Sequence, residues 1–202
     1  GNLIGTDVSG LGSMGNRAPG VFLEENASRN IIGPDNIIAF NGSGGIEIRS
    51  IHAEANIITR NSIHDNLGQG IYYNTNEDPL VVSPPIPAIF NFDLASGTVH
   101  GTACPGCIVE IFSTSMSDGE FFEGSVTADK DGTFFFDLGL GFNNPLLTAT
   151  SLSPGDNTSE FSVPISEPLI FATFQESNTS PQTRLEPKPV EELEDNRIGW
   201  IA

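Results

Sequence analysis

Cys104 and Cys107 are the side chains whose type and spacing most directly suggest chemistry. Two cysteines separated by two residues can form a redox pair, half of a zinc site or a short disulfide. A redox pair opens a helix that lowers a thiol pKa, but residues 108–112 (Ile-Val-Glu-Ile-Phe) predict a strand. A zinc site needs four ligands, and the chain has two cysteines and three histidines without matching spacing. Of these three alternatives, the sequence favours a local disulfide across the Pro-Gly turn, formed in an oxidising compartment.

Two further pairs could support chemistry. His64 and Asp65 could act as a general base with its orienting partner. Asp129 and Asp131 resemble part of a calcium loop, although the other acids of that motif are missing. We interpret the first pair as the exposed end of a strand and the second as a hairpin turn that ends at Gly132. The sequence therefore assigns no catalytic residue, no metal ligand and no cofactor.

A repeat of 25 residues organises the first third of the chain. Gly-Val-Phe-Leu at 20–23, Gly-Ile-Glu-Ile at 45–48 and Gly-Ile-Tyr-Tyr at 70–73 keep this interval, and so do residues 36–41 and 61–66. Units of this length cannot bury their own apolar face and stack on copies of themselves. Because the pieces are short, β-rich and without helical periodicity, the sequence predicts coils of about three strands, stacked in parallel as a β-helix.

Asparagines recur at the ends of these predicted strands. Asparagine tolerates the left-handed backbone region and bonds to nearby backbone groups, so we expect corners there. Matched residues on adjacent coils could form ladders of stacked amides. The alternative is that they line a carbohydrate groove. The residues are Asn30, Asn36, Asn41, Asn56, Asn61 and Asn66.

The matched positions also show which side chains share a face. Phe22, Glu47 and Tyr72 form one row, and Glu24, Arg49 and Asn74 form another. Neither row is the pair of acids that a glycoside hydrolase requires. If the coils bind a glycan without cleaving it, the candidate contacts are Tyr72, Tyr73, Glu47 and Arg49.

The first part of the chain resembles a known family. The motifs at residues 1–7, 11–16, 30–33 and 36–46 look like the right-handed parallel β-helix repeats of large bacterial secreted and cell-surface proteins. The resemblance covers roughly residues 1–78. It implies an architecture and an extracellular setting, and no catalytic residues, since most members have no assigned reaction. We expect these coils to be the end of a longer rod.

The second part of the chain does not continue the 25-residue repeat. After a Pro-rich stretch, six short strands are expected at 96–102, 108–113, 121–128, 133–138, 146–152 and 158–164. The motifs at 97–103, 109–112, 124–134, 148–150 and 156–162 are similar to immunoglobulin-like modules that follow β-helices in bacterial surface proteins, over about residues 84–165. That resemblance implies a spacer or adhesive domain. The predicted organisation is all-β: 1–78 β-helix coils, 79–90 Pro-rich linker, 91–165 antiparallel Ig-like sandwich and 166–202 disordered acidic tail.

Charge limits the classes of partner. The chain carries 26 acidic and 8 basic residues, a formal net charge of −18, and phosphate backbones are bound by clustered Lys and Arg, so nucleic acid is not expected. No stretch approaches the ~18 apolar residues of a membrane span. We expect a structural or adhesive module of a secreted or surface-displayed bacterial protein whose partners are extracellular polysaccharide or cell-surface components. The alternative is a fragment of a β-helix polysaccharide lyase or hydrolase.

Overall fold

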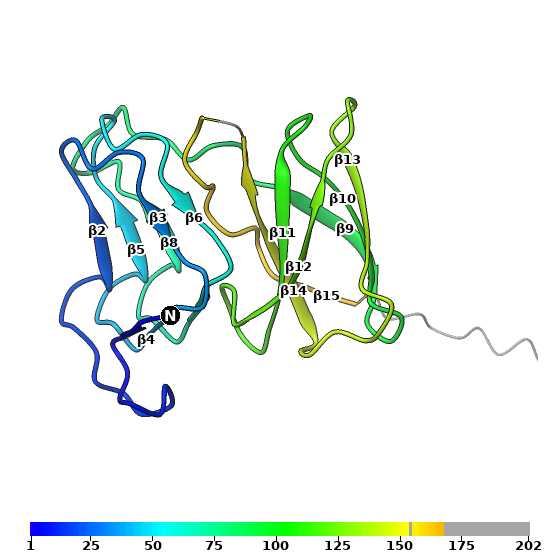
Figure 1. Cartoon of the computed structure of the whole chain (residues 1–202), viewed down its shortest axis with the longest axis horizontal. Coiled ribbons are helices and arrows are strands. Elements are labelled where there is room, and N and C mark those ends of the chain that lie inside the picture. The colour runs from blue at the N-terminus through cyan, green and yellow to red at the C-terminus, as the bar shows by residue number, and fades with distance from the viewer. Residues whose placement is uncertain (154, 168–202) are drawn as a thin grey trace, which may run out of the picture. The chain divides into compact units, whose positions relative to one another are not determined.

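The computed structural model describes residues 1–153 and 155–167, and every regular element among them is a β-strand (Figure 1). The all-β prediction is confirmed for these residues. The expected disordered tail falls almost entirely outside them. No helix among the described residues could cross a membrane. Residues 1–167 belong to one compact unit, and the predicted boundary at 79–90 stays a prediction.

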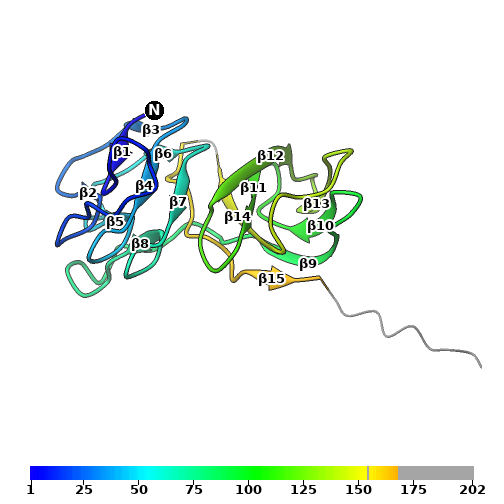
Figure 2. The same cartoon turned by 90° about the horizontal axis from the view of Figure 1, so that it is seen from below.

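The first 73 residues build three parallel sheets (Figures 1 and 2). Three of their five strand pairs keep the predicted period of 25, and the other two join residues 34 and 26 apart. The register joins Val21 to Ile46 and Ile46 to Ile71. We call the strands that begin the sheets the leading edge and those that end them the trailing edge. The sheets are β1 (Leu3–Ile4), β4 (Ile37–Ala39) and β7 (Ser62–His64); β2 (Val21–Leu23), β5 (Ile46–Ile48) and β8 (Ile71–Tyr73); and β3 (Ile31–Ile32) with β6 (Ile57–Ile58). The leading edge is therefore β1, β2 and β3, and the trailing edge is β6, β7 and β8.

Isoleucines fill the space between the three sheets. Ile38, Ile46 and Ile48 are 0% exposed, and Ile63 and Ile71 are 1% and 2% exposed. Together they form one apolar cluster with their neighbours. Strands of two or three residues cannot enclose such side chains alone. We call each run of the chain that adds one strand to each sheet a coil, and burial of these side chains depends on the coil before and the coil after.

The predicted amide ladders are present, but the backbone prediction for the asparagines is wrong. Asn41 accepts hydrogen bonds from the backbone N and the Nδ2 of Asn16, at 3.2 and 3.0 Å, and donates to Asn66 Oδ1 at 2.9 Å. The left-handed conformation belongs to the residue before each asparagine, as at Phe40, where φ is 60°. At each corner, therefore, one residue takes the left-handed conformation, and the asparagine after it forms the hydrogen bonds to the adjacent coil. The six residues that bend are Arg29, Asp35, Phe40, Ala55, Arg60 and Asp65.

Two antiparallel sheets follow and share a second apolar cluster. The sequence missed β9, which begins at Ala88 inside the predicted linker. It also predicted a strand at 158–164, where the structure has an isolated bridge at Thr158 and no regular strand. One sheet holds β9 (Ala88–Asp93), β10 (Thr98–Thr102) and β13 (Thr133–Asp137), and the other holds β11 (Ile108–Thr114), β12 (Phe121–Thr127), β14 (Leu146–Leu152) and β15 (Ile165–Ser166).

The turn between β10 and β11 contains the predicted disulfide. Cys104 and Cys107 are bonded, with their Cα atoms 5.4 Å apart. Because β11 follows directly, no helix begins at this pair as a redox motif would require.

Candidate functional site

Three of the predicted glycan contacts lie on the outer side of one parallel sheet. Glu47 pairs with Phe22 on one side and Tyr72 on the other, in a single row across β2, β5 and β8. The guanidinium carbon of Arg49 lies 4.1 Å from the centre of the Phe22 ring, which is cation–π geometry. We call the side chains of Phe22, Arg49 and Tyr72 the contact face.

Glu47 supports the contact face from below. Its side chain is only 4% exposed, and its Oε1 accepts hydrogen bonds from Arg49 Nε at 2.6 Å and Asn74 Nδ2 at 2.7 Å. The hydrogen bond to Glu47 also raises the pKa of Arg49 above its ordinary value. Glu47 therefore holds the guanidinium in place over Phe22, and its own oxygen atoms are scarcely available to a ligand.

Tyr73 lies in the core, and its predicted role as a glycan contact needs correction. It is 4% exposed, and its hydroxyl donates to the carbonyl of Thr158 at 2.7 Å. Burial raises the pKa of Tyr73 well above its ordinary value of 10.0. Successive side chains of a strand point to opposite faces, so Tyr72 and Tyr73 cannot serve one surface together.

The His64–Asp65 pair has the hydrogen bond that a base and its orienting partner would need. His64 Nδ1 lies 2.8 Å from Asp65 Oδ2, and the imidazole meets the ring of Phe40 edge-on. Asp65 also lines a surface cavity of about 500 Å³ together with Phe40 and Met116. Asp65 is one of the bent corner residues, with φ at 52°, which accounts for its position without a reaction.

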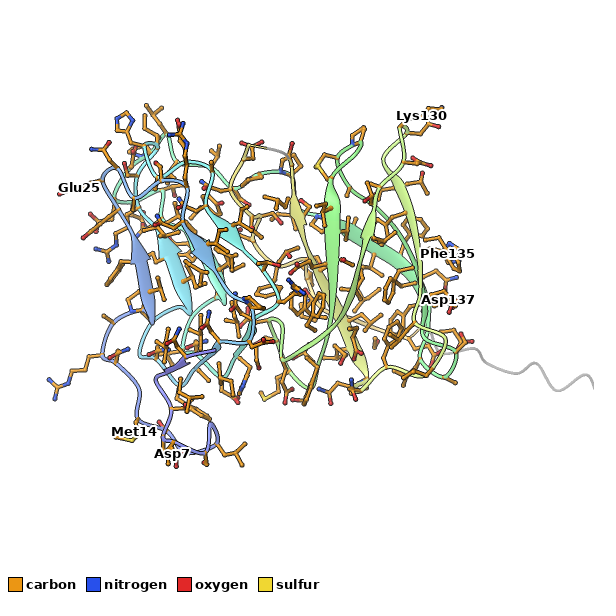
Figure 3. All side chains as sticks on the ribbon, in the orientation of Figure 1. Asp7, Met14, Glu25, Lys130, Phe135 and Asp137 are labelled. Carbon is orange, nitrogen blue, oxygen red and sulfur yellow. A yellow bond between two sulfur atoms is a disulfide. The ribbon has the colours of Figure 1, made fainter. Side chains whose placement is uncertain are left out.

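The Asp129–Asp131 pair forms a hairpin turn. Asp129 Oδ1 accepts hydrogen bonds from the backbone N of Asp131 and of Thr133, both at 2.8 Å. Lys130 lies at the tip of this turn (Figure 3) and bonds to Asp131. The carboxylate of Asp129 is therefore used by backbone donors, as the turn interpretation predicts.

Sequence reasoning missed the way in which the antiparallel sheets cover the trailing edge. Within the coils, the backbone N of Gly20 and of Gly45 donates to a carbonyl of the next coil, at 3.2 and 3.0 Å. At the trailing edge the equivalent N of Gly70 donates to Asp118 Oδ1 at 2.8 Å. A carboxylate oxygen thus occupies the place of the next carbonyl.

Two more carboxylates do the same. Asp35 N donates to the carbonyl of Arg60 at 2.8 Å, and Arg60 N donates in turn to Glu110 Oε2 at 3.0 Å. Tyr73 N donates to Glu160 Oε1 at 3.0 Å. Backbone N–H groups left unpaired at a buried edge are costly, so these acids complete the last strands.

Asn157 continues an amide ladder although it lies far away in the sequence. Asn30 N donates to Asn56 Oδ1 at 3.0 Å, and Asn56 N donates to Asn157 Oδ1 at 2.7 Å. The Nδ2 of Asn56 donates to the carbonyl of Ala27, and that of Asn157 donates to the carbonyl of Ala53, both at 2.7 Å. Asn157 therefore reproduces the bonds of the next corner asparagine.

Thr158 and Gly119 bond to two more positions on the trailing edge. Ile58 N donates to Thr158 Oγ1 at 2.9 Å, and Ile63 exchanges two backbone hydrogen bonds with Gly119. No period links these residues to the coils, so the repeat gives no signal for them. We call Glu110, Asp118, Asn157, Thr158 and Glu160 the cap residues.

The burial of Asp118 and the partial burial of Glu110 make stability depend on pH. Burial raises the pKa of Glu110 above its ordinary value of 4.5 and that of Asp118 above 3.8, against the hydrogen bonds that each accepts. A folded-state pKa above the unfolded one means that the carboxyl stabilises the fold at acid pH. That contribution is lost as pH rises through the raised pKa.

We expect Glu110→Gln to match wild type within about 0.5 kcal/mol near pH 4, since a protonated carboxyl, like an amide, offers one carbonyl acceptor and one donor toward Thr59 and Arg60. Toward about pH 7 the variant should become the more stable of the two, because the wild-type acid ionises in its partly buried position and glutamine does not. Urea unfolding across this range measures both effects. A wild type that gains stability over the variant as pH rises would contradict the assignment.

Comparison with known proteins found no match: no protein family matches the chain, and no curated protein matches it.

Proposed function

We propose that the chain is a structural and adhesive module of a secreted or surface-displayed bacterial protein. In this proposal the three parallel sheets are coils of a right-handed parallel β-helix, and the antiparallel sheets are an immunoglobulin-like spacer. The observation that carries it is the covered trailing edge, where five cap residues bond the last coil to the antiparallel sheets. Five such hydrogen bonds would hold the last coil against the following part of the chain in a fixed orientation, which a rod joined to its spacer requires.

An extracellular setting fits the chemistry of the chain. A disulfide persists in oxidising compartments. The formal net charge of −18 favours solubility and disfavours nucleic acid as a partner. The partners that we propose are therefore extracellular polysaccharides or cell-surface components.

The contact face is the proposed glycan site. Aromatic rings offer an apolar surface to the C–H face of a sugar, and Phe22 and Tyr72 lie in one row with Glu47 between them. Arg49 adds hydrogen-bond donors for sugar hydroxyls or carboxylates, and Glu47 fixes its orientation.

We expect Tyr72→Ala and Arg49→Ala each to weaken binding to a recognised polysaccharide about tenfold, a loss of about 1.4 kcal/mol. Affinity electrophoresis in gels containing neutral or uronic-acid polysaccharides measures this. Phe135→Ala is the matched control, because Phe135 is an exposed aromatic residue on β13, away from the contact face (Figure 3). Binding that survives both replacements, or that Phe135→Ala weakens equally, would reject this face.

A second candidate function is polysaccharide cleavage, which the His64–Asp65 pair beside its cavity favours. Release of reducing ends or unsaturated sugars by the purified chain, abolished in His64→Ala and retained in Tyr72→Ala, would replace the adhesive proposal.

A further inference from the structure

A surface cavity of about 500 Å³ lies where the last two coils meet the loop between β11 and β12. Phe40 and Leu67 line it from successive coils, and Met116 lines it from the loop. None of these three side chains belongs to the first coil. The loop is fixed to the trailing edge, because Gly119 exchanges two backbone hydrogen bonds with Ile63. The walls of the cavity are therefore formed without a ligand.

Two of the walls are large apolar side chains that remain mostly in solvent. Leu67 is 83% exposed and Met116 is 75% exposed. Covering such side chains with an apolar group is favourable because it removes apolar surface from water. A thioether such as that of Met116 also adapts its shape to what it contacts. The cavity therefore suits a ligand with an apolar part.

Asp65 gives the cavity a single negative charge. It is the only Asp, Glu, Lys or Arg among the residues that line the cavity, and its side chain is 51% exposed. Its Oδ2 lies 2.8 Å from Nδ1 of His64, whereas no donor in residues 1–153 and 155–167 bonds to its Oδ1. One carboxylate oxygen is therefore open to a cation, and the net charge of −18 favours cations over anions.

Phe40 stands at a position that does not suit its type. Its φ of 60° lies in the left-handed region, which glycine, asparagine and aspartate adopt readily and a bulky residue rarely does. It is the only aromatic residue among the six that bend at the corners. Backbone strain of this kind collects at ligand sites, where the side chain itself is needed. An aromatic ring near a carboxylate is a combination that binds ammonium ions.

We propose that this cavity binds an alkylammonium ion. The ammonium group pairs with Asp65 beside the ring of Phe40, and the alkyl chain covers Leu67 and Met116. An exposed ion pair contributes little alone, so binding needs both the charge and the chain of the ligand. The site performs no reaction, and it does not depend on the proposed adhesive function.

The test is a titration of the 15N-labelled chain with n-butylammonium, followed by NMR. We expect saturable shifts of the amide signals of residues 40–42, 65–67 and 116–118, with a Kd of about 1–10 mM, as suits so small a ligand. n-Butanol keeps the alkyl chain without the charge, and ammonium keeps the charge without the chain. Each should bind about three- to tenfold more weakly. Signals that do not move at these residues, or equal binding by either comparison compound, overturn the proposal.

Asp65→Asn tests the charge. Asparagine suits the left-handed corner, so we expect the fold to persist and the Kd to rise about three- to tenfold. The matched control is Glu25→Gln, which removes the same charge from another exposed residue in the left-handed region, with φ at 51° (Figure 3). It should bind as wild type does. Equal weakening in the two variants would mean that net charge alone attracts the amine, and it would reject the cavity.

Phe40→Asn separates binding from stability. Asparagine adopts the left-handed backbone more readily, which offsets the lost contact with His64, so the Tm should fall by no more than about 2 °C. The Kd should rise about three- to tenfold. A ring that serves packing alone would give the reverse result, a lower Tm with unchanged binding, and that result overturns its role.

Circular dichroism reports whether these variants fold. If they do not, Met116→Lys at its exposed loop position gives the same test, because the new ammonium group shares the cavity with Asp65 and should exclude the ligand. Unchanged butylammonium binding in this variant overturns the proposal. Nα-acetyl-lysine N-methylamide identifies the source of the amine: tighter binding than butylammonium assigns the site to a lysine side chain of a partner, and weaker binding assigns it to a free amine.

Discussion

Replacing Asn41 with alanine is expected to lower the free energy of unfolding by about 3–5 kcal/mol, among the largest effects of any single change in this chain. Asn41 is 1% exposed. It accepts two hydrogen bonds from Asn16 and donates to the carbonyl of Ala39 and to Asn66 Oδ1. Alanine would remove all four of these side-chain bonds, including the one to the carbonyl of the buried Ala39.

Urea unfolding followed by circular dichroism measures this loss. Asn41→Asp tests the acceptor role of the side chain apart from its donor role. It keeps the oxygen that accepts from Asn16 but places a carboxylate beside Asn66 Oδ1. We expect a loss as large as that of alanine near neutral pH, smaller under acid conditions where the carboxyl is protonated. Asn76→Ala, at an exposed position after β8, should change stability by less than about 0.5 kcal/mol. A small effect of Asn41→Ala would mean that the ladders do not stabilise the coils.

Gly45→Ala is expected to cost about 3 kcal/mol for a steric reason. A methyl group at Gly45 would lie 2.6 Å from the carbonyl oxygen of Gly70 and 2.6 Å from Cγ2 of Ile63. The first of these atoms is backbone of the next coil, so relief requires the coils to move apart and weakens the hydrogen bonds that join β5 to β8.

The matched control for this change is Gly68→Ala. There the nearest atom to the added methyl would be 3.3 Å away, and the backbone is not in the left-handed region. We expect a loss below about 1 kcal/mol, measured by thermal or urea unfolding beside Gly45→Ala. Equal losses of stability in the two variants would show that the close approach of the next coil is not the reason why Gly45→Ala is destabilising.

The period of 25 was sufficient to predict the parallel pairing of β2 with β5, β5 with β8 and β4 with β7, because equal spacing puts equivalent residues in register. The period does not account for β1 with β4 or β3 with β6, whose paired residues are 34 and 26 apart. It carried no information on which residue bends at each corner. The bent positions hold arginine, aspartate, phenylalanine and alanine, and these types share no preference that a sequence displays. The function of Gly45 was equally hidden, since its contacts are with Gly70 and Ile63 on the next coil.

The candidate site was only partly predictable. Matched offsets placed Glu47 beside Tyr72, and the alternation of a strand could have separated Tyr72 from Tyr73. The burial of Glu47 under Arg49 depends on Asn74 and on the Phe22 ring, which no local pattern encodes. The cap residues were not predictable at all, because their partners in the coils lie 48 to 104 residues away along the chain.

These separations bear on the order in which the protein can fold. The coils come first along the chain, but Gly70 and Asn56 find their last partners at Asp118 and Asn157. Contacts over such distances form late and slow the search for the native state. A ribosome adds about 5–20 residues per second, so a nascent chain would hold finished coils with a bare final edge for several seconds. That interval is when chaperones or neighbouring nascent chains have access to the edge.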